Sequence, residues 1–211
     1  MLAPVLCAGC SEPDVSVCRV CEASLAPVPR LVDRDGLCCW TACDYRGPVA
    51  AVLRAFKDEG RTDVAASLAR TLRVVLATAV ASTPGSYEVC TIPSTPAAYR
   101  ARGYRPVPYL LHRCGVRPTP VLQFVRERAD QVGLTAAQRR KNLEGSLASR
   151  CSLVGRRFVL VDDITTTGST LHDARRALCA AGAIEPLIVV IAQTPRRYCT
   201  DKPPFPEQSV T

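Results

Sequence analysis

The feature that most constrains this sequence is the stretch FVLVDDITTTGST at residues 158–170. It opens with the apolar run Phe158 to Val161, which is typical of a strand buried on both faces in a parallel sheet. Two carboxylates, Asp162 and Asp163, follow this run, and a turn rich in threonine and glycine leads into a helical pattern. We therefore predict an α/β domain with a mostly parallel sheet, built around this strand–turn–helix unit.

The chemistry of this stretch indicates a ligand with two different halves. Free N–H groups at the start of a helix favour an anion, and Gly168 lets the backbone approach that anion closely. The carboxylates would repel a phosphate, so they have to face hydroxyl groups or a bridging divalent cation instead. A sugar phosphate satisfies both requirements. The alternative is an ordinary βα turn in which Asp and Thr serve only as caps.

The stretch resembles the phosphoribosyl-pyrophosphate signature of the type I phosphoribosyltransferases, which implies their α/β fold and a phosphoribosyl-pyrophosphate ligand. It also implies that Asp162 and Asp163 are the catalytic acid pair, which holds the ribose hydroxyls and the water shell of Mg²⁺. The 5-phosphate would lie on the turn residues Thr166, Thr167, Gly168, Ser169 and Thr170. Purine-salvage members often have an Asp at the position of Thr166, so we expect no ordinary hypoxanthine or guanine transfer here.

Basic side chains elsewhere are candidates for the pyrophosphate. Arg100 and Arg102 follow the predicted first core strand at residues 87–92, and in the resembled family that loop lies against the pyrophosphate. Guanidinium groups bind phosphate oxygens bidentately, whereas the alternative reading is an exposed basic turn. Lys57, just before Gly60, could also reach a phosphate, but we expect it at a solvated helix end.

Four cysteines near the N-terminus predict a metal site. Cys7, Cys10, Cys18 and Cys21 form two C-x-x-C pairs with seven residues between them. Each pair can place two thiolates on one tetrahedral ion, so the two pairs complete a closed site for structural zinc. Because no ligand position stays open, we expect no chemistry there. Free or oxidised thiols are the alternative.

The order of motifs narrows the resemblance. After the zinc knuckle come a Tyr-Arg-Gly turn with a downstream Lys-x-x-Gly, an Arg-Gly-Tyr element at residues 102–104, and a segment with Gln138 and Asn142. With the acid-pair turn, this series resembles the ComF family of competence-associated phosphoribosyltransferase-like proteins, from Cys7 to about Ile191. The family usually continues Arg-Gly-aromatic with Asn-Gln, whereas this chain continues with Arg-Pro. In the family, the segment around Gln138 is expected to cover the site.

Length and composition set the expected organisation. The 211 residues allow one full domain and a small appendage. We predict a zinc knuckle over residues 1–30, a phosphoribosyltransferase-like domain over 37–196 and a disordered tail over 197–211. The start lacks a basic n-region, and no apolar run approaches the roughly 20 residues that span a bilayer, so we expect a cytoplasmic protein without membrane insertion.

The charge distribution leaves three functions open. The formal net charge is +8, and residues 93–157 hold thirteen Arg or Lys against three acids. Such a segment favours an anionic partner, either a polyphosphate ligand or nucleic acid. Part of its positive charge is also explained by an ordinary solvated surface. The candidates are a phosphoribosyltransferase, an accessory protein for DNA uptake that binds single-stranded DNA or uptake proteins, and a regulator that binds phosphoribosyl pyrophosphate without turnover.

Overall fold

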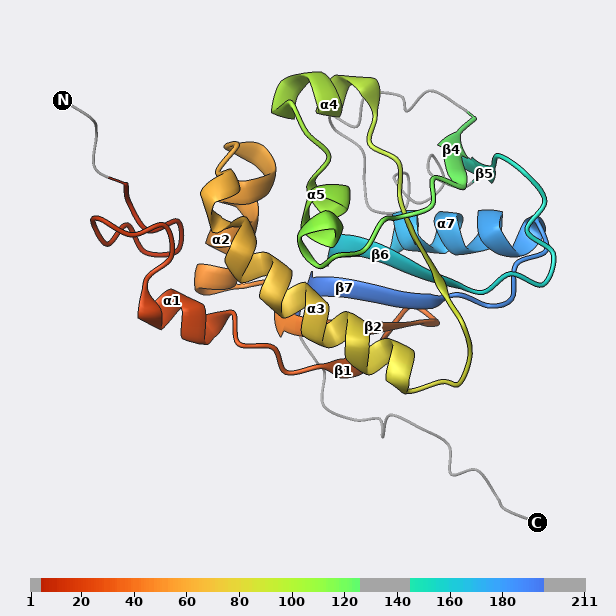
Figure 1. Ribbon diagram of the computed structural model, residues 1–211, viewed down its shortest axis with the longest axis horizontal. Coiled ribbons are helices and arrows are strands. Elements are labelled where there is room, and N and C mark those ends of the chain that lie inside the picture. The colour runs from red at the N-terminus through yellow and green to blue at the C-terminus, as the bar shows by residue number, and fades with distance from the viewer. Residues whose placement is uncertain (1–4, 126–144, 196–211) are drawn as a thin grey trace, which may run out of the picture.

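The computed structural model describes residues 5–125 and 145–195, and its centre is a five-stranded sheet (Figure 1). The strand order is β1-β2-β7-β6-β3, in which only the edge pair β1–β2 is antiparallel. The prediction of an α/β fold with a mostly parallel sheet is therefore confirmed. The strands are β1 (Arg30–Arg34), β2 (Leu37–Asp44), β3 (Glu88–Thr91), β6 (Phe158–Thr165) and β7 (Leu187–Gln193).

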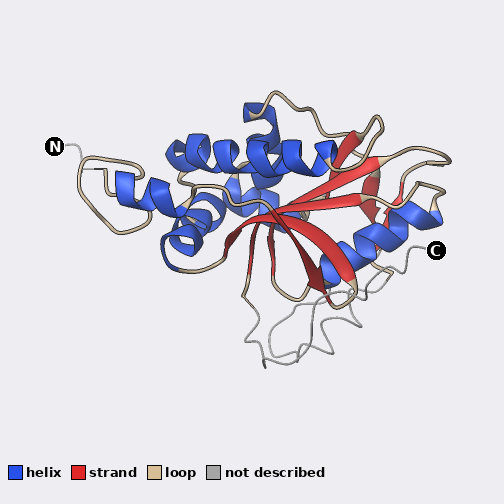
Figure 2. Ribbon diagram, turned by 90° about the horizontal axis from the view of Figure 1, so that it is seen from below, coloured by secondary structure: helices blue, strands red, loops and turns tan. Residues whose placement is uncertain are grey.

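Helices cover both faces of the sheet (Figure 2). On one face α2 (Gly47–Asp58), α3 (Ala65–Ala81) and α5 (Pro106–Arg113) pack against residues such as Val159 and Val161. On the other face α7 (Ser169–Ala180) packs against Phe158 and Leu160. All four of these β6 residues are fully buried, because successive side chains of a strand point to opposite faces. The apolar run of β6 is thus explained by burial on both sides.

Strand β6 is longer than predicted. Its pairing with β7 continues past Val161 to Thr165, which lies opposite Gln193. Asp162 and Asp163 are therefore strand residues, with Asp162 opposite Val190, and the turn begins only at Thr166. The strand geometry sends the two adjacent carboxylates in different directions, which leaves Asp162 half-buried and Asp163 buried.

The N-terminal segment is attached to the α/β domain by packing and polar contacts. It contains α1 (Arg19–Ser24), and Leu25 directly after this helix is buried in the main core. The carbonyl of Leu25 accepts a hydrogen bond of 2.7 Å from Thr71 Oγ1 of α3. Glu22 forms an ion pair of 2.7 Å with Arg70, also on α3. The cysteine segment and α3 therefore share part of one core.

Two short elements lie near the basic middle of the chain. Strand β4 (Leu122–Phe124) pairs with β5 (Leu147–Ser149) in a separate antiparallel sheet. Residues 96–102, expected as part of the loop after the first core strand, form helix α4 (Pro96–Arg102). The short helix η1 (Thr62–Val64) lies between α2 and α3. The predicted covering segment at 138–142 and the tail at 197–211 lie outside the described residues.

A buried carboxylate fixes the chain where β5 begins. Asp173 of α7 is 4% exposed and accepts hydrogen bonds from the backbone N–H groups of Gly145 and Leu147, both at 2.8 Å, and from Ser146 Oγ at 3.0 Å. Arg176, one turn further along α7, adds an ion pair of 2.8 Å. The pKa of Asp173 is lowered: burial raises it, but these donors together lower it more.

One described segment is long and apolar enough to cross a membrane by length and composition. It is residues Thr62–Ala81, and 56% of an apolar 18-residue window within it is buried inside the protein. Its helix α3 packs on β2, β7 and α5, so the apolar side chains are used in the core. Burial of this kind explains its hydropathy without a bilayer.

Candidate functional site

The predicted acid pair lies in a pocket at the carboxyl ends of β6 and β3. This is the edge of a parallel sheet at which ligands of open α/β proteins bind. The pocket has a volume of about 310 Å³, and its walls come from the ends of these strands, the end of α2, helices α4 and α5, and the start of α7. Its polar lining residues include Lys57, Thr95, Arg102, Asp162, Asp163 and Thr170.

Asp163 makes the closest charged contact in this pocket. Its Oδ2 lies 2.8 Å from Lys57 Nζ, and its Oδ1 lies 3.0 Å from the same nitrogen. The backbone N–H of Ile164 also donates to Asp163 Oδ1, at 2.8 Å. Asp162 Oδ1 accepts a hydrogen bond of 2.9 Å from the backbone N–H of Asp163. Both carboxylates thus accept hydrogen bonds from donors of the chain.

Lys57 is a site residue that sequence reasoning assigned to a solvated helix end. The structure instead turns its side chain, which is 31% exposed, onto the acid pair. Burial lowers the pKa of Lys57, but the nearby charges of Asp163 and Asp162 raise it more, so the net pKa is above its ordinary value. Lys57 is therefore an ammonium ion at neutral pH. The available signal was a lysine in the last turn of a helix ahead of Gly60.

The two predicted pyrophosphate arginines have different positions. Arg102 lines the pocket and forms an ion pair of 3.1 Å with Asp58, the neighbour of Lys57 on α2. Arg100 is exposed and does not line the pocket. Helix α4 accounts for this split, because residues two positions apart on a helix point in different directions. The structure therefore brings Arg102 and Lys57 together with the acid pair, and leaves Arg100 outside.

The predicted phosphate turn lies at the N-terminus of α7. Gly168 has φ 73°, a left-handed conformation that favours glycine, and it caps the N-terminus of α7. The hydroxyls of Thr167 and Ser169 lie 2.9 Å apart, Thr166 and Thr167 are exposed, and Thr170 lines the pocket. A Cβ at Gly168 would lie 3.6 Å from Arg34 Cβ of β1. The turn therefore rests on the β1–β2 hairpin beside the pocket.

The four predicted metal ligands lie together. The Sγ atoms of Cys7, Cys10, Cys18 and Cys21 are all within 4.8 Å of one another. Zinc–sulfur bonds of about 2.3 Å in a tetrahedron bring sulfurs to about 3.8 Å, and Cys10 Sγ lies 3.6 Å from Cys18 Sγ. A Cβ at Gly9 would lie 2.5 Å from Cys21 Sγ, so the first knuckle requires glycine. The cluster fits a closed structural zinc ion.

The pKa of one of these thiols is lowered, whereas burial raises the pKa of Cys21, and the pKa of Cys18 is also raised. Burial raises the pKa of Cys7, but hydrogen bonds from the backbone of Cys18, Gly9 and Cys10 lower it more, to about 6. The Cys18 N–H donates to Cys7 Sγ at 3.2 Å. A thiolate at neutral pH is the form that binds zinc.

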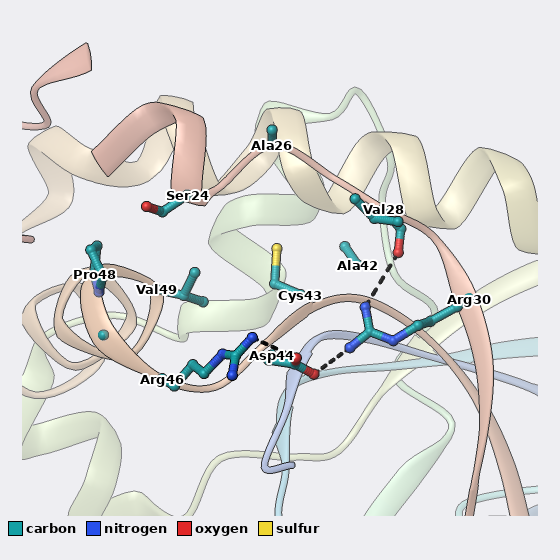
Figure 3. Close-up of a pocket in the computed structure, with 11 residues that line it drawn as sticks. Ser24, Ala26, Val28, Arg30, Ala42, Cys43, Asp44, Arg46, Pro48 and Val49 are labelled. Carbon is teal, nitrogen blue, oxygen red and sulfur yellow. Dashed lines mark hydrogen bonds and ion pairs between the residues drawn. The ribbon is translucent and has the colours of Figure 1, made fainter. Parts of the chain in front are cut away.

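A second pocket, of about 490 Å³, lies between the end of the cysteine segment and the start of α2 (Figure 3). Asp44, at the end of β2, is paired with both Arg30 and Arg46, and its distance to Arg46 is 3.6 Å. Burial raises the pKa of the Cys43 thiol in its wall to about 11. This pocket is at the opposite end of α2 from Lys57, about 16 Å away at 1.5 Å per residue, and it contains no predicted site residue.

Comparison with known proteins gives only distant likenesses. No family model matches the sequence, and no curated protein matches it. Twenty-two solved chains are similar to it in structure. An adenine phosphoribosyltransferase has a TM-score of 0.40 and 14% identity, and the match covers 82% of this chain and 89% of that one. Adenine phosphoribosyltransferase from Saccharomyces cerevisiae, complexed with an iminoaltritol bisphosphate and adenine, has a TM-score of 0.38 and 16% identity, covering 82% and 88%.

A hypoxanthine phosphoribosyltransferase from Staphylococcus aureus is similar over 64% of this chain and 68% of that one, with a TM-score of 0.35 and 14% identity. Likenesses at this level carry no argument about activity.

Proposed function

We propose that this protein binds phosphoribosyl pyrophosphate with Mg²⁺ and transfers the phosphoribosyl group to a base-like acceptor. The observation that supports this proposal best is the acid pair of β6, Asp162 and Asp163, with the ammonium of Lys57 paired to Asp163. A vicinal diol or a hydrated divalent cation is the partner that such a pair of carboxylates binds. The basic side chains of Lys57 and Arg102 and the turn at 166–170 line or border the same pocket, so both halves of a sugar phosphate find partners.

Each group of the chain has a role on this proposal. Asp162 and Asp163 accept hydrogen bonds from the ribose hydroxyls, and the turn at 166–170 donates to the 5-phosphate. Lys57 and Arg102 neutralise the pyrophosphate as its bond to the anomeric carbon breaks and a bond to an acceptor nitrogen forms. Asp162 and Asp163 would hold Mg²⁺ through its water shell, and the ion would supply positive charge to offset that of the pyrophosphate. The contribution of the protein is thus positional and electrostatic.

The residues after the acid pair constrain the acceptor. Thr166 cannot take a proton from a purine near pH 7, so we propose an acceptor that needs no carboxylate base at this position.

The motif order supports a ComF-type role connected with DNA uptake. The metal-type pattern among the twelve cysteines supports a reducing compartment, and hence the cytoplasm.

A second candidate is a single-stranded DNA-binding accessory. Tyr99 of α4 is 46% exposed, and the guanidinium of Arg105 lies 5.4 Å from the centre of its ring. Exposed aromatic rings beside arginines are typical of surfaces on which bases stack. On this alternative, DNA binding falls steeply as salt is raised.

Calorimetric titration tests the first candidate. Phosphoribosyl pyrophosphate with Mg²⁺ is expected to bind the zinc-loaded wild type, and the Asp162→Asn/Asp163→Asn variant is expected to lose at least about 100-fold in affinity. Each removed carboxylate deletes charge-assisted contacts of about 1.5–3 kcal/mol. Glu59→Gln, which neutralises an exposed carboxylate at the end of α2, is the control that should bind as wild type does. Failure of the folded wild type to bind would overturn the proposal and favour the DNA-binding candidate.

A further inference from the structure

The position of Lys57 conflicts with the ligand that the pocket is built to bind. Its ammonium lies 2.8 Å from Asp163 Oδ2, where a ribose hydroxyl or the water shell of a divalent cation would have to bind. Asp163 is 4% exposed, so it has little room for a third partner. A ligand that uses Asp163 therefore has to move Lys57 away, and a displaced ammonium in a half-buried pocket needs a new anion.

We infer that Lys57 is an exchangeable counter-ion, which neutralises the acid pair in the empty pocket and moves to the pyrophosphate when the ligand binds. This inference rests on the proposed function, because phosphoribosyl pyrophosphate supplies both the groups that replace Lys57 and the anion that receives it. Four rotatable bonds let a lysine side chain make such a move without any change in the backbone.

Arg102 is arranged in a similar way. It lines the pocket and is paired at 3.1 Å with Asp58, which is 55% exposed and next to Lys57 in the chain. An exposed pair of this kind contributes little stability, so a phosphate can take the guanidinium at low cost. Two basic side chains that line one pocket, each paired with a carboxylate, are thus available to a single polyphosphate.

The movement of Lys57 makes the pocket selective for a ligand that carries both hydroxyl groups for the acid pair and an anion for the displaced ammonium. A free divalent cation has to displace Lys57 and offers the ammonium no anion in return. Ribose 5-phosphate carries the hydroxyls but no pyrophosphate, so it also leaves Lys57 without a partner. Phosphoribosyl pyrophosphate replaces the ion pair with Asp163 by an ion pair with phosphate. Lys57 is therefore a specificity-determining residue on this account.

Replacement of Lys57 by methionine tests the inference through two effects of opposite sign. Mn²⁺ alone, followed by the loss of the free-ion paramagnetic resonance signal, is expected to bind Lys57→Met about tenfold or more tightly than wild type, because the competing charge is gone. Phosphoribosyl pyrophosphate with Mg²⁺, followed by calorimetry, is expected to bind the same variant about tenfold or more weakly, because a charge-assisted phosphate contact is lost.

Two further variants serve as controls. Lys57→Arg keeps the positive charge, so its Mn²⁺ binding should remain weak. Arg54→Met removes one charge from the exposed face of the same helix, outside the pocket lining, and should leave both affinities unchanged. Circular dichroism of each variant should match wild type.

The outcomes separate this inference from the proposed function. Unchanged or weaker Mn²⁺ binding by Lys57→Met overturns the counter-ion role. Unchanged or tighter phosphoribosyl-pyrophosphate binding by Lys57→Met overturns the transfer to pyrophosphate. If the wild type binds no phosphoribosyl pyrophosphate, the proposed function fails together with the transfer, while the Mn²⁺ comparison still decides whether Lys57 neutralises the acid pair.

Discussion

Cys21→Ser is expected to abolish tight zinc binding and to lower the melting temperature by about 6–12 °C. Structural zinc supplies most of the folding energy of such a knuckle, since the polar residues between the cysteine pairs cannot form a core. Without it, Leu25 leaves the core and Thr71 loses its bond to the Leu25 carbonyl. These losses amount to about 3 kcal/mol of unfolding free energy. Each kcal/mol lowers the melting temperature of a domain of this size by about 2–4 °C.

Calorimetric unfolding and elemental analysis of the purified proteins measure this effect. Cys151→Ser is a matched control, because Cys151 is an exposed cysteine outside the cluster. It should retain one zinc ion per chain and the wild-type melting temperature. If wild type contains no metal, and Cys21→Ser melts where wild type does, then the cysteine cluster is not a structural zinc site.

Asp173→Asn is expected to destabilise the protein by about 3 kcal/mol at pH 7, because it leaves a buried network without its charge. The amide that replaces the carboxylate can no longer accept all the hydrogen bonds from Gly145, Ser146 and Leu147, and it loses the ion pair with Arg176. Urea unfolding of both proteins gives the difference in free energy. Asp173 lies outside the ligand pocket, so this is a test of the fold rather than of binding.

The pH dependence gives this prediction a second readout. Because the pKa of Asp173 is lower in the folded protein than in the unfolded chain, its charge stabilises the fold above about pH 4, and this stabilisation is lost as the pH falls through the folded pKa. The difference between wild type and Asp173→Asn should therefore shrink on acidification. A difference that stays constant from pH 7 to pH 3 would contradict an ionic role. Glu59→Gln should show no comparable effect.

Local patterns predicted much of the fold and part of the site. The apolar run 158–161 identified the central strand, because burial on both faces requires apolar side chains at every position. The spacing of the cysteines identified the metal cluster, since both knuckles are determined by contacts within a few residues. The α4 helix also had local signals that the expectation of a loop passed over: Thr95 caps it, Pro96 opens it and Gly103 ends it with φ 75°.

The features that sequence reasoning missed depend on contacts between distant parts of the chain. Strand β6 extends through the acid pair because β7 pairs with it as far as Thr165, and no local pattern reports that register. Strand β5 has three residues, too few for a periodic signal. Lys57 and Asp163 are 106 positions apart, so only the fold shows that they form an ion pair.

The most direct test of the sugar-phosphate site is a crystal structure of the protein with phosphoribosyl pyrophosphate and Mg²⁺. We expect the ribose hydroxyls on Asp162 and Asp163, the 5-phosphate on the turn at 166–170, and the pyrophosphate beside Lys57 and Arg102. Lys57 should then no longer contact Asp163. Ligand density in the pocket between Arg30 and Arg46, or an acid pair still bound to Lys57 at saturating ligand, would contradict this arrangement.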